Sequence, residues 1–259
     1  MPQTYIRVEP RGRTTIVTIS RPEVLNALHT DAHYELHEAF DAFAADPEQW
    51  VAIITGAGDK AFCAGHDLKL QASGGHRGTP PTGFGGLTKR FDLTKPVIAA
   101  VNGVAMGGGF EIALACDLIV ASETAVFALP EVRVGLAALA GGLHRLPRQI
   151  GLKRAMGMIL TARRVSAPEG LELGFVNEVV APNDLMRSAE RWADAICQNS
   201  PMSVRASKEA VLKGLEEPLE QAIAKQADYA AVKAMVASQD YIEGPRAFAE
   251  KRPPHWLGR

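Results

Sequence analysis

Three things are scarce in this chain: net charge, long apolar runs and cysteine. Its 259 residues carry 28 basic and 29 acidic side chains, a net charge of −1, which argues against nucleic acid as a partner because phosphate binding leaves a basic footprint. No apolar run approaches the roughly 18 residues of a membrane span, and the first residues lack the apolar core of a signal peptide. We expect a soluble, cytoplasmic protein with no membrane partner.

The cysteines are too few and too scattered to build a structural site. Cys63, Cys116 and Cys197 are odd in number and far apart in the sequence, a pattern that fits neither a disulfide framework nor a zinc site. We expect three reduced residues in the protein core, and no bound metal.

A dinucleotide site is also excluded by what is missing. Residues 56–61, Gly-Ala-Gly-Asp-Lys-Ala, formally match the G-x-G-x-x-G/A fingerprint. A Rossmann site would next require a helix and, about 20 residues later, an acid that holds the ribose. No Asp or Glu occurs between Asp67 and Asp92, and glycines interrupt any helix there.

Short strands, glycine turns and short helices recur through the first 180 residues, which predicts an α/β fold of coiled β-β-α units. We expect strands at 14–19, 51–55, 96–101, 117–121 and 125–128, and helices from residue 30 and at 108–115, 143–150 and 153–160. The apolar residues Ala32, Leu36, Phe40 and Phe43 give the first helix a buried face. After about residue 183 the pattern is helical. We therefore expect a core domain over residues 1–200 and a helical region over 201–259.

Residues 73–86 form the one stretch of low complexity, with six glycines and two prolines. Such a segment is expected to be a loop that cannot pack a core. Since it follows a candidate site segment, it either covers a ligand or is a mobile surface loop.

Glu111 and Glu131 are the residues most suggestive of chemistry. Glu111 follows three consecutive glycines, and Glu131 follows Pro130, 20 positions later. Their neighbours are apolar, so a carboxylate at either place is costly unless it has a partner or a task. We interpret the two as a paired acid and base.

Two glycine turns precede the candidate acids and predict exposed main-chain donors. Gly65 permits a tight turn before His66, and Asp67 can cap a following helix; Gly107 to Gly109 play the same part before Glu111. N–H groups at two helix starts can converge on one oxygen and stabilise an oxyanion. The alternative is that the glycines only permit close packing of helix on strand.

Four strings in the chain carry a family resemblance: AFCAGHDLK, PVIAAVNGVAMGGGFEIALACDLIVAS, FALPEVRVGL and EGPRAFAEKRPP. Together they resemble the enoyl-CoA hydratase/isomerase (crotonase) family over nearly the whole chain. Within it, the string GFGGLTKRFDLTKPVIAAVNG and the Pro254 to Arg259 tail are most similar to the carnitinyl-CoA dehydratase branch. The resemblance implies a crotonase spiral of β-β-α repeats with a C-terminal helical region for oligomerisation.

The resemblance also implies an activity. It places the thioester carbonyl on the backbone N–H groups of His66 and Gly108, the water on Glu111 and the α-carbon proton on Glu131. Since both glutamates are present, reversible hydration of an enoyl-CoA is favoured, with a carnitinyl-CoA-like substrate. The alternatives are an isomerase, a C–C lyase or a non-catalytic acyl-CoA-binding protein. No cofactor is implied beyond the coenzyme A of the substrate, and the assembly implied is a trimer or a dimer of trimers.

The resemblance further implies contacts to coenzyme A. These involve Leu25, Ala27, Ala64, Asp67, Leu68, Phe248 and Lys251, the last two often reaching the site of a neighbouring subunit. Lys251 is otherwise an ordinary solvated charge, and Phe248 a helix-packing residue.

The chain departs from the family pattern at three places. His66 replaces a small residue, and its side chain either narrows the acyl pocket, touches a polar substrate group or is simply a partly buried histidine. Residues 136–142 replace the usual proline- and glycine-containing turn, and His144 has no family role and is expected to be structural.

Overall fold

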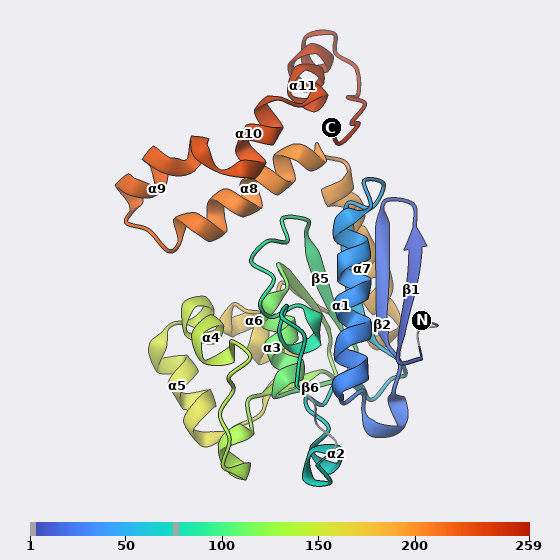
Figure 1. The fold of residues 1–259 in the computed structure, drawn as a ribbon, viewed down its shortest axis with the longest axis vertical. Helices are drawn as coiled ribbons and strands as arrows, with labels where there is room; N and C mark the ends of the chain where they lie inside the picture. Colours follow the sequence, from blue (N-terminus) through green and yellow to red (C-terminus); the bar gives the residue numbers. More distant parts are fainter. Residues whose placement is uncertain (1–3, 75–77) are drawn as a thin grey trace.

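The computed structural model describes residues 4–74 and 78–259 and has two sheets connected by a spiral of short helices. The larger sheet has six strands in the order β1-β2-β3-β5-β7-β10, and the smaller has four in the order β4-β6-β8-β9. In the larger sheet all neighbours are parallel except β1 and β2. In Figure 1, β1 and β2 lie to the right of α1, and the shorter helices α3 to α6 lie to its left.

The strands are β1 (Ile6–Arg11), β2 (Thr14–Ile19), β3 (Val51–Gly56), β4 (Ala61–Cys63), β5 (Val97–Val101), β6 (Val104–Met106), β7 (Leu118–Ser122), β8 (Val126–Ala128), β9 (Val165–Ser166) and β10 (Glu178–Val180). The α-helices are α1 (Thr30–Ala45), α2 (Leu68–Ala72), α3 (Gly108–Ala115), α4 (Gly142–Ile150), α5 (Leu152–Thr161), α6 (Ala167–Leu173), α7 (Leu185–Cys197), α8 (Pro201–Gly214), α9 (Leu219–Lys225), α10 (Ala230–Val236) and α11 (Gln239–Ala249). Single 3₁₀ turns are η1 (Pro22–Val24), η2 (Phe84–Gly86), η3 (Glu131–Val134), η4 (Pro182–Asp184) and η5 (Gln226–Asp228).

Each turn of the spiral contributes one strand to each sheet, which confirms the predicted β-β-α arrangement. β3 and β4, β5 and β6, and β7 and β8 are successive pairs whose first member joins the six-stranded sheet and whose second joins the four-stranded sheet. The strands β4, β6 and β8 have three residues each, and the chain turns soon after them, at Gly65 and Gly107 with positive φ and at Pro130. Those turns bring the segments that follow β4, β6 and β8 to one region of the molecule.

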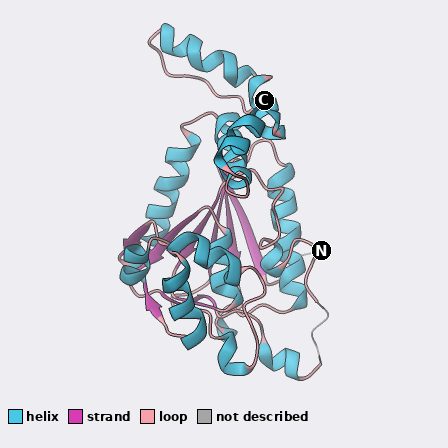
Figure 2. Ribbon diagram, turned by 90° about the vertical axis from the view of Figure 1, so that its left-hand side faces the viewer, coloured by secondary structure: helices cyan, strands magenta, loops and turns pink. Residues whose placement is uncertain are grey.

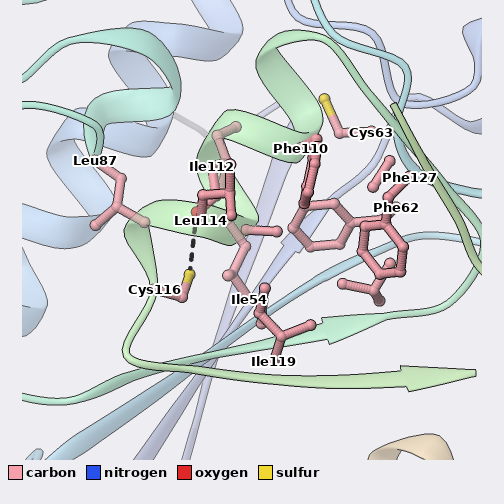
Figure 3. Close-up of a cluster of buried hydrophobic side chains, with 14 of the residues drawn as sticks. Ile54, Phe62, Cys63, Leu87, Phe110, Ile112, Leu114, Cys116, Ile119 and Phe127 are labelled. Carbon is pink, nitrogen blue, oxygen red and sulfur yellow. Dashed lines mark hydrogen bonds between the residues drawn. The ribbon is translucent and has the colours of Figure 1, made fainter. Parts of the chain in front are cut away.

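A cluster of aromatic and branched side chains fills the space between the two sheets (Figure 3). Phe110 of α3 packs against Phe127 of β8 and against Phe175, with ring centroids 5.2 and 5.1 Å apart. Phe62 and Ile112 are fully buried in the same cluster. The helix that carries Glu111 is therefore held on its apolar side by the core, while its first turn faces the turns after β4 and β8.

Most predicted elements are confirmed within a residue or two, and α3 spans the predicted residues. All four apolar positions predicted for α1 are buried. The sequence reading missed β1, in which charged residues alternate with apolar ones, and the short strands β4 and β6. The segment after β3 leads into β4 and not into the helix that a dinucleotide fingerprint requires.

The three cysteines are free, as predicted, and Cys63 and Cys116 lie in the core while Cys197 is partly buried. Burial raises the pKa of the Cys63 thiol to about 12.

The helices from α8 onward extend away from the sheets (Figures 1 and 2). The last residues pack back on α11 and on the end of α7. The buried carboxylate of Asp240 accepts the N–H groups of Leu257 and Gly258 at 2.8 and 3.2 Å, and Nε1 of Trp256 donates to the carbonyl oxygen of Gln198 at 2.8 Å. Within residues 4–74 and 78–259, no helix has the length and apolar character needed to span a membrane. The division into a core and a helical region at residue 200 stays a prediction.

Candidate active site

Glu111 lies in the first turn of α3 and is almost completely buried, with 3% of its surface exposed. Its Oε1 accepts the N–H of Gly142 at 2.8 Å. A Cβ atom built on Gly142 would lie 3.0 Å from Cγ of Glu111, so a side chain there would push Glu111 aside by a few tenths of an ångström. Burial raises the pKa of Glu111 to about 7; the Gly142 N–H opposes this shift, and the charge of Glu131 adds to it.

Glu131 is the first residue of η3, directly after β8 and Pro130, and it is partly buried. Its Oε1 would lie 2.9 Å from a Cβ atom built on Gly107, next to the start of α3. Its Oε2 is buried and has no hydrogen-bond partner among the residues that the structure describes. Burial raises the pKa of this carboxyl as well, so the predicted pair occupies one poorly solvated site.

The two turns that were predicted to supply main-chain donors lie against each other. A Cβ atom built on Gly65 would be 3.2 Å from the amide nitrogen of Gly108, and one on Gly109 would be 2.0 Å from the carbonyl oxygen of Cys63. Gly108 is the first residue of α3, so its N–H has no acceptor inside the helix. His66 follows Gly65 directly, so the amides of His66 and Gly108 belong to backbone segments in contact.

The prediction that residues 73–86 cannot pack a core is wrong for the second half of that segment. Gly85 and Gly86 are buried against α1. The N–H of Gly85 donates to Nδ1 of His33 at 3.0 Å, and a Cβ atom on Gly86 would be 2.4 Å from the nitrogen of His37. Because glycine has no side chain, this backbone lies flat on the helix. Residues 75–77 lie outside the described residues.

Three rings form a wall beside the start of α3. The ring of Phe84 lies so close to Gly108 that a Cβ atom built there would be 2.3 Å from it. The same ring packs edge-on against the His33 ring, with centroids 4.4 Å apart. The His66 ring is partly buried, 6.1 Å from His33 and 6.3 Å from Phe84. Sequence reasoning missed Phe84 and His33; the available signal was a histidine among the buried positions of α1.

The predicted coenzyme A contacts at Leu25, Ala27 and Ala64 come together at one turn. The backbone of Leu25 and Asn26 is left-handed, with φ of 55 and 56°, and the Ala64 N–H donates to the Leu25 carbonyl at 3.0 Å. Buried Asn26 holds this turn, because its Nδ2 donates to the carbonyl oxygens of Ala57 and Ala61 at 3.0 and 2.7 Å. Ala27 is buried, whereas Leu25 is exposed.

Asp67 and Leu68 lie at the start of α2, beside that turn. As predicted, Asp67 caps the helix, since its Oδ1 accepts the Leu70 N–H at 3.3 Å. Its carboxylate also pairs with Arg21 at 3.2 Å; despite partial desolvation, the Leu70 N–H and Arg21 hold the pKa of Asp67 below its ordinary value. The Leu68 side chain is exposed. Arg21 is a third residue that sequence reasoning missed.

Phe248 and Lys251 are not brought to the site within one chain. Phe248 of α11 is 88% exposed, and Lys251 follows that helix in a left-handed conformation with φ of 53°. Figure 1 places α11 and α2 at opposite ends of the molecule. Their contact with coenzyme A stays a prediction.

The chain matches a family model described as enoyl-CoA hydratase/isomerase over residues 12–259. The chain belongs to the enoyl-CoA hydratase/isomerase family. This confirms the resemblance and the crotonase fold that were inferred from the sequence strings.

Similar proteins and solved structures agree with this assignment. The chain is 45% identical to carnitinyl-CoA dehydratase of Salmonella typhi over 247 residues, 94% of each chain, and 42% identical to that of Proteus mirabilis over 258 residues, 98% of each. The crystal structure of enoyl-CoA hydratase from Mycobacterium tuberculosis H37Rv has a TM-score of 0.93 at 39% identity, over 99% of this chain and 100% of that one. Carnitinyl-CoA hydratase from Mycobacterium avium has a TM-score of 0.79 at 42% identity, over 99% of this chain and 100% of that one.

Proposed function

We propose that this family member is an enoyl-CoA hydratase/dehydratase, a hydro-lyase that reversibly adds water across the α,β double bond of an acyl-CoA thioester. The observation that carries the proposal is the pair Glu111 and Glu131 beside the first turn of α3, both with a pKa raised by burial. Such a pair holds one base and one acid near neutral pH.

In the proposed hydration, the ionised carboxylate takes a proton from water, and the resulting hydroxyl adds to the β carbon. Negative charge moves onto the thioester oxygen, where the amides of His66 and Gly108 stabilise it. The protonated carboxyl then delivers its proton to the α carbon, and dehydration is the reverse. The step changes no oxidation state overall, so it requires no redox cofactor, and coenzyme A enters as part of the substrate.

We assign the water to Glu111 and the α-carbon proton to Glu131. Glu111 accepts main-chain N–H donors from Gly142 and Ala140, which favour its charged form. Glu131 has a buried Oε2 for which the described residues offer no donor, and such an environment favours the protonated form. These hydrogen bonds support Glu111 as the base, while burial raises the pKa of both carboxyls.

We further propose a carnitinyl-CoA-like acyl group, as the names of the relatives suggest. A cationic acyl group suits a site with two carboxyls and the ring of Phe84, because aromatic faces attract quaternary ammonium groups. Coenzyme A is expected to bind along Leu25, Ala27, Ala64, Asp67 and Leu68.

We also propose that the protein is a homo-oligomer, a trimer or a dimer of trimers, assembled through its C-terminal helices. Apolar side chains there are exposed in the single chain, among them Leu215, Leu219 and Ile242. In this assembly Phe248 and Lys251 would reach a neighbouring site. A cytoplasmic location would keep the three cysteines reduced.

The test follows the absorbance of the conjugated enoyl thioester with crotonyl-CoA and crotonobetainyl-CoA, for the wild type and for the Glu111→Gln and Glu131→Gln variants. Loss of one proton-transfer group should lower the rate by about 10²–10⁴-fold in either variant. Glu38→Gln, an exposed position on α1, is the matched control and should leave the rate unchanged. If both site variants keep rates within a few-fold of the wild type, the assignment is wrong.

Mass spectrometry of the products separates the alternatives. Only hydration adds the mass of water; an isomerase leaves the mass unchanged, and a C–C lyase splits the acyl group. Tight coenzyme A binding by calorimetry, with no turnover over a broad panel of acyl-CoAs, would instead support a non-catalytic binding protein.

A further inference from the structure

Arg145 is a partly buried cation near Glu111 to which the proposed mechanism gives no task. It lies in the first turn of α4, three residues after Gly142, and is partly buried. Its Nη2 donates to the carbonyl oxygen of Thr88 at 2.8 Å, and its guanidinium lies 5.8 Å from the ring of Phe91. Burial lowers the pKa of Arg145, but an arginine stays protonated at any pH relevant to the enzyme.

Two adjacent glycines bring this cation close to Glu111. A Cβ atom on Gly141 would lie 2.2 Å from Nη1 of Arg145, and the next residue, Gly142, donates its N–H to Oε1 of Glu111 at 2.8 Å. Standard bond lengths then place the guanidinium nitrogen within about 9 Å of the carboxylate oxygen. The turn at 141 and 142 is therefore shared by the base and by the cation.

The charged groups that act on Glu111 come from two sides. Glu131 of η3 raises the pKa of Glu111, and Arg145 of α4 lowers it. Arg145 in turn is influenced by Glu111 and by the thiol of Cys116. Other titratable side chains near the start of α3 are the buried thiol of Cys63 and the imidazoles of His66 and His33, which form the ring wall with Phe84.

We propose that Arg145 is a positioning residue whose charge favours the ionised form of Glu111 and so sets the pH above which this carboxyl can activate water. The inference depends on the proposed hydratase function. Glu111 is buried, and burial disfavours its charged form. A positive charge at the turn that also binds its Oε1 opposes that effect. At about 9 Å and an effective dielectric constant of about 20 to 40, this charge is expected to shift the pKa of Glu111 by about one unit.

Arg145 also has a structural contact, which the experiment must separate from its charge. Thr88, whose carbonyl it binds, accepts the Phe84 N–H on its Oγ1 at 2.9 Å. Loss of the guanidinium would therefore disturb the ring wall as well. A purely structural role predicts a lower rate at every pH, whereas the proposed role predicts a displaced pH profile.

The experiment measures kcat/KM for crotonyl-CoA from pH 5.5 to 9.5 in the wild type and in Arg145→Met and Arg145→Lys, with Phe91→Leu as a control. Removing the cation raises the pKa of Glu111. The acid limb of the pH profile of kcat/KM for Arg145→Met should therefore move up by about one pH unit. Its rate should be about tenfold below the wild type at low pH and recover above pH 9. Arg145→Lys, which keeps a charge but loses the planar contact to Thr88, should keep the wild-type limb. Phe91 is an exposed residue and Phe91→Leu should also keep it.

An unshifted limb in Arg145→Met, with only a uniform loss of rate, would overturn the proposal while leaving the hydratase function intact. If Arg145→Met does not fold, Arg145→Gln takes its place. If the wild type turns over no enoyl-CoA, the proposed function fails first. Arg145 is then tested by ¹³C NMR titration of glutamate carboxyls, with the Glu111 signal assigned by its absence in Glu111→Gln. An equal Glu111 titration in the wild type and in the neutral variant would then refute the role of the charge.

Discussion

Replacing Glu111 by glutamine is expected to make the protein more stable at alkaline pH while it removes the activity. The folded chain raises the pKa of Glu111 from 4.5 to about 7 because the carboxyl is buried. Between these pH values the folded chain binds more protons than the unfolded chain, so the wild type loses stability as the pH rises. The shift corresponds to about 3 kcal/mol once Glu111 is fully charged.

Glutamine has no charge to desolvate, and its side-chain oxygen can still accept the Gly142 N–H. We therefore expect Glu111→Gln to exceed the wild type in unfolding free energy by about 3 kcal/mol at pH 8.5, and by less than about 1 kcal/mol at pH 5. Urea unfolding, followed by tryptophan fluorescence at one fixed protein concentration, measures both values. Glu38→Gln makes the same chemical change at an exposed position and should show no such dependence. A Glu111→Gln variant that is less stable at pH 8.5, or a difference that ignores pH, would refute the reasoning.

Three other measurements test the buried base, a close glycine contact and the turn at Asn26. For the wild type, kcat/KM should rise with pH through about 7, because the base Glu111 must be ionised; an acid limb near 4.5 would contradict its burial. Gly109→Ala should destabilise the protein, since its Cβ would lie 2.0 Å from the Cys63 carbonyl oxygen. Gly157→Ala is the control and should not, because no atom lies within 4 Å of its Cβ. The Tm of each variant is measured against that of the wild type. Asn26→Ala removes the hydrogen bonds to Arg21, Ala57 and Ala61 and should lower the free energy of unfolding by about 2–4 kcal/mol. The Tm should then fall by at least about 5 °C. An unchanged Tm would show that these hydrogen bonds do not stabilise the turn.

The parts of the fold that the sequence predicted are those with strong local signals. The helix from Thr30 has a repeating apolar face, and the three glycines before α3 mark its start. The acid pair was recognisable because charged residues stand out among apolar neighbours. The three-residue strands β4 and β6 are too short to show a period, so they were missed.

The rest of the site depends on contacts between distant parts of the chain. Phe84 meets Gly108 because glycines 85 and 86 lie flat on α1, and no local pattern predicts such a contact. Arg21 reaches Asp67 across 46 positions. Arg145 reads as an ordinary basic residue of a helix until Thr88 and Gly141 are placed around it.

The contact between Gly65 and the start of α3 has a consequence for how this scaffold can be reshaped. The donors proposed for the thioester oxygen belong to the main chain of His66 and Gly108, and glycines at 65 and 109 fix their spacing by backbone contact. The ring wall that faces them is made of side chains. Library mutagenesis at Phe84 and His33 should therefore retune the choice of acyl group without dismantling the machinery that handles the carbonyl, which makes those two positions a sound starting point for new substrates.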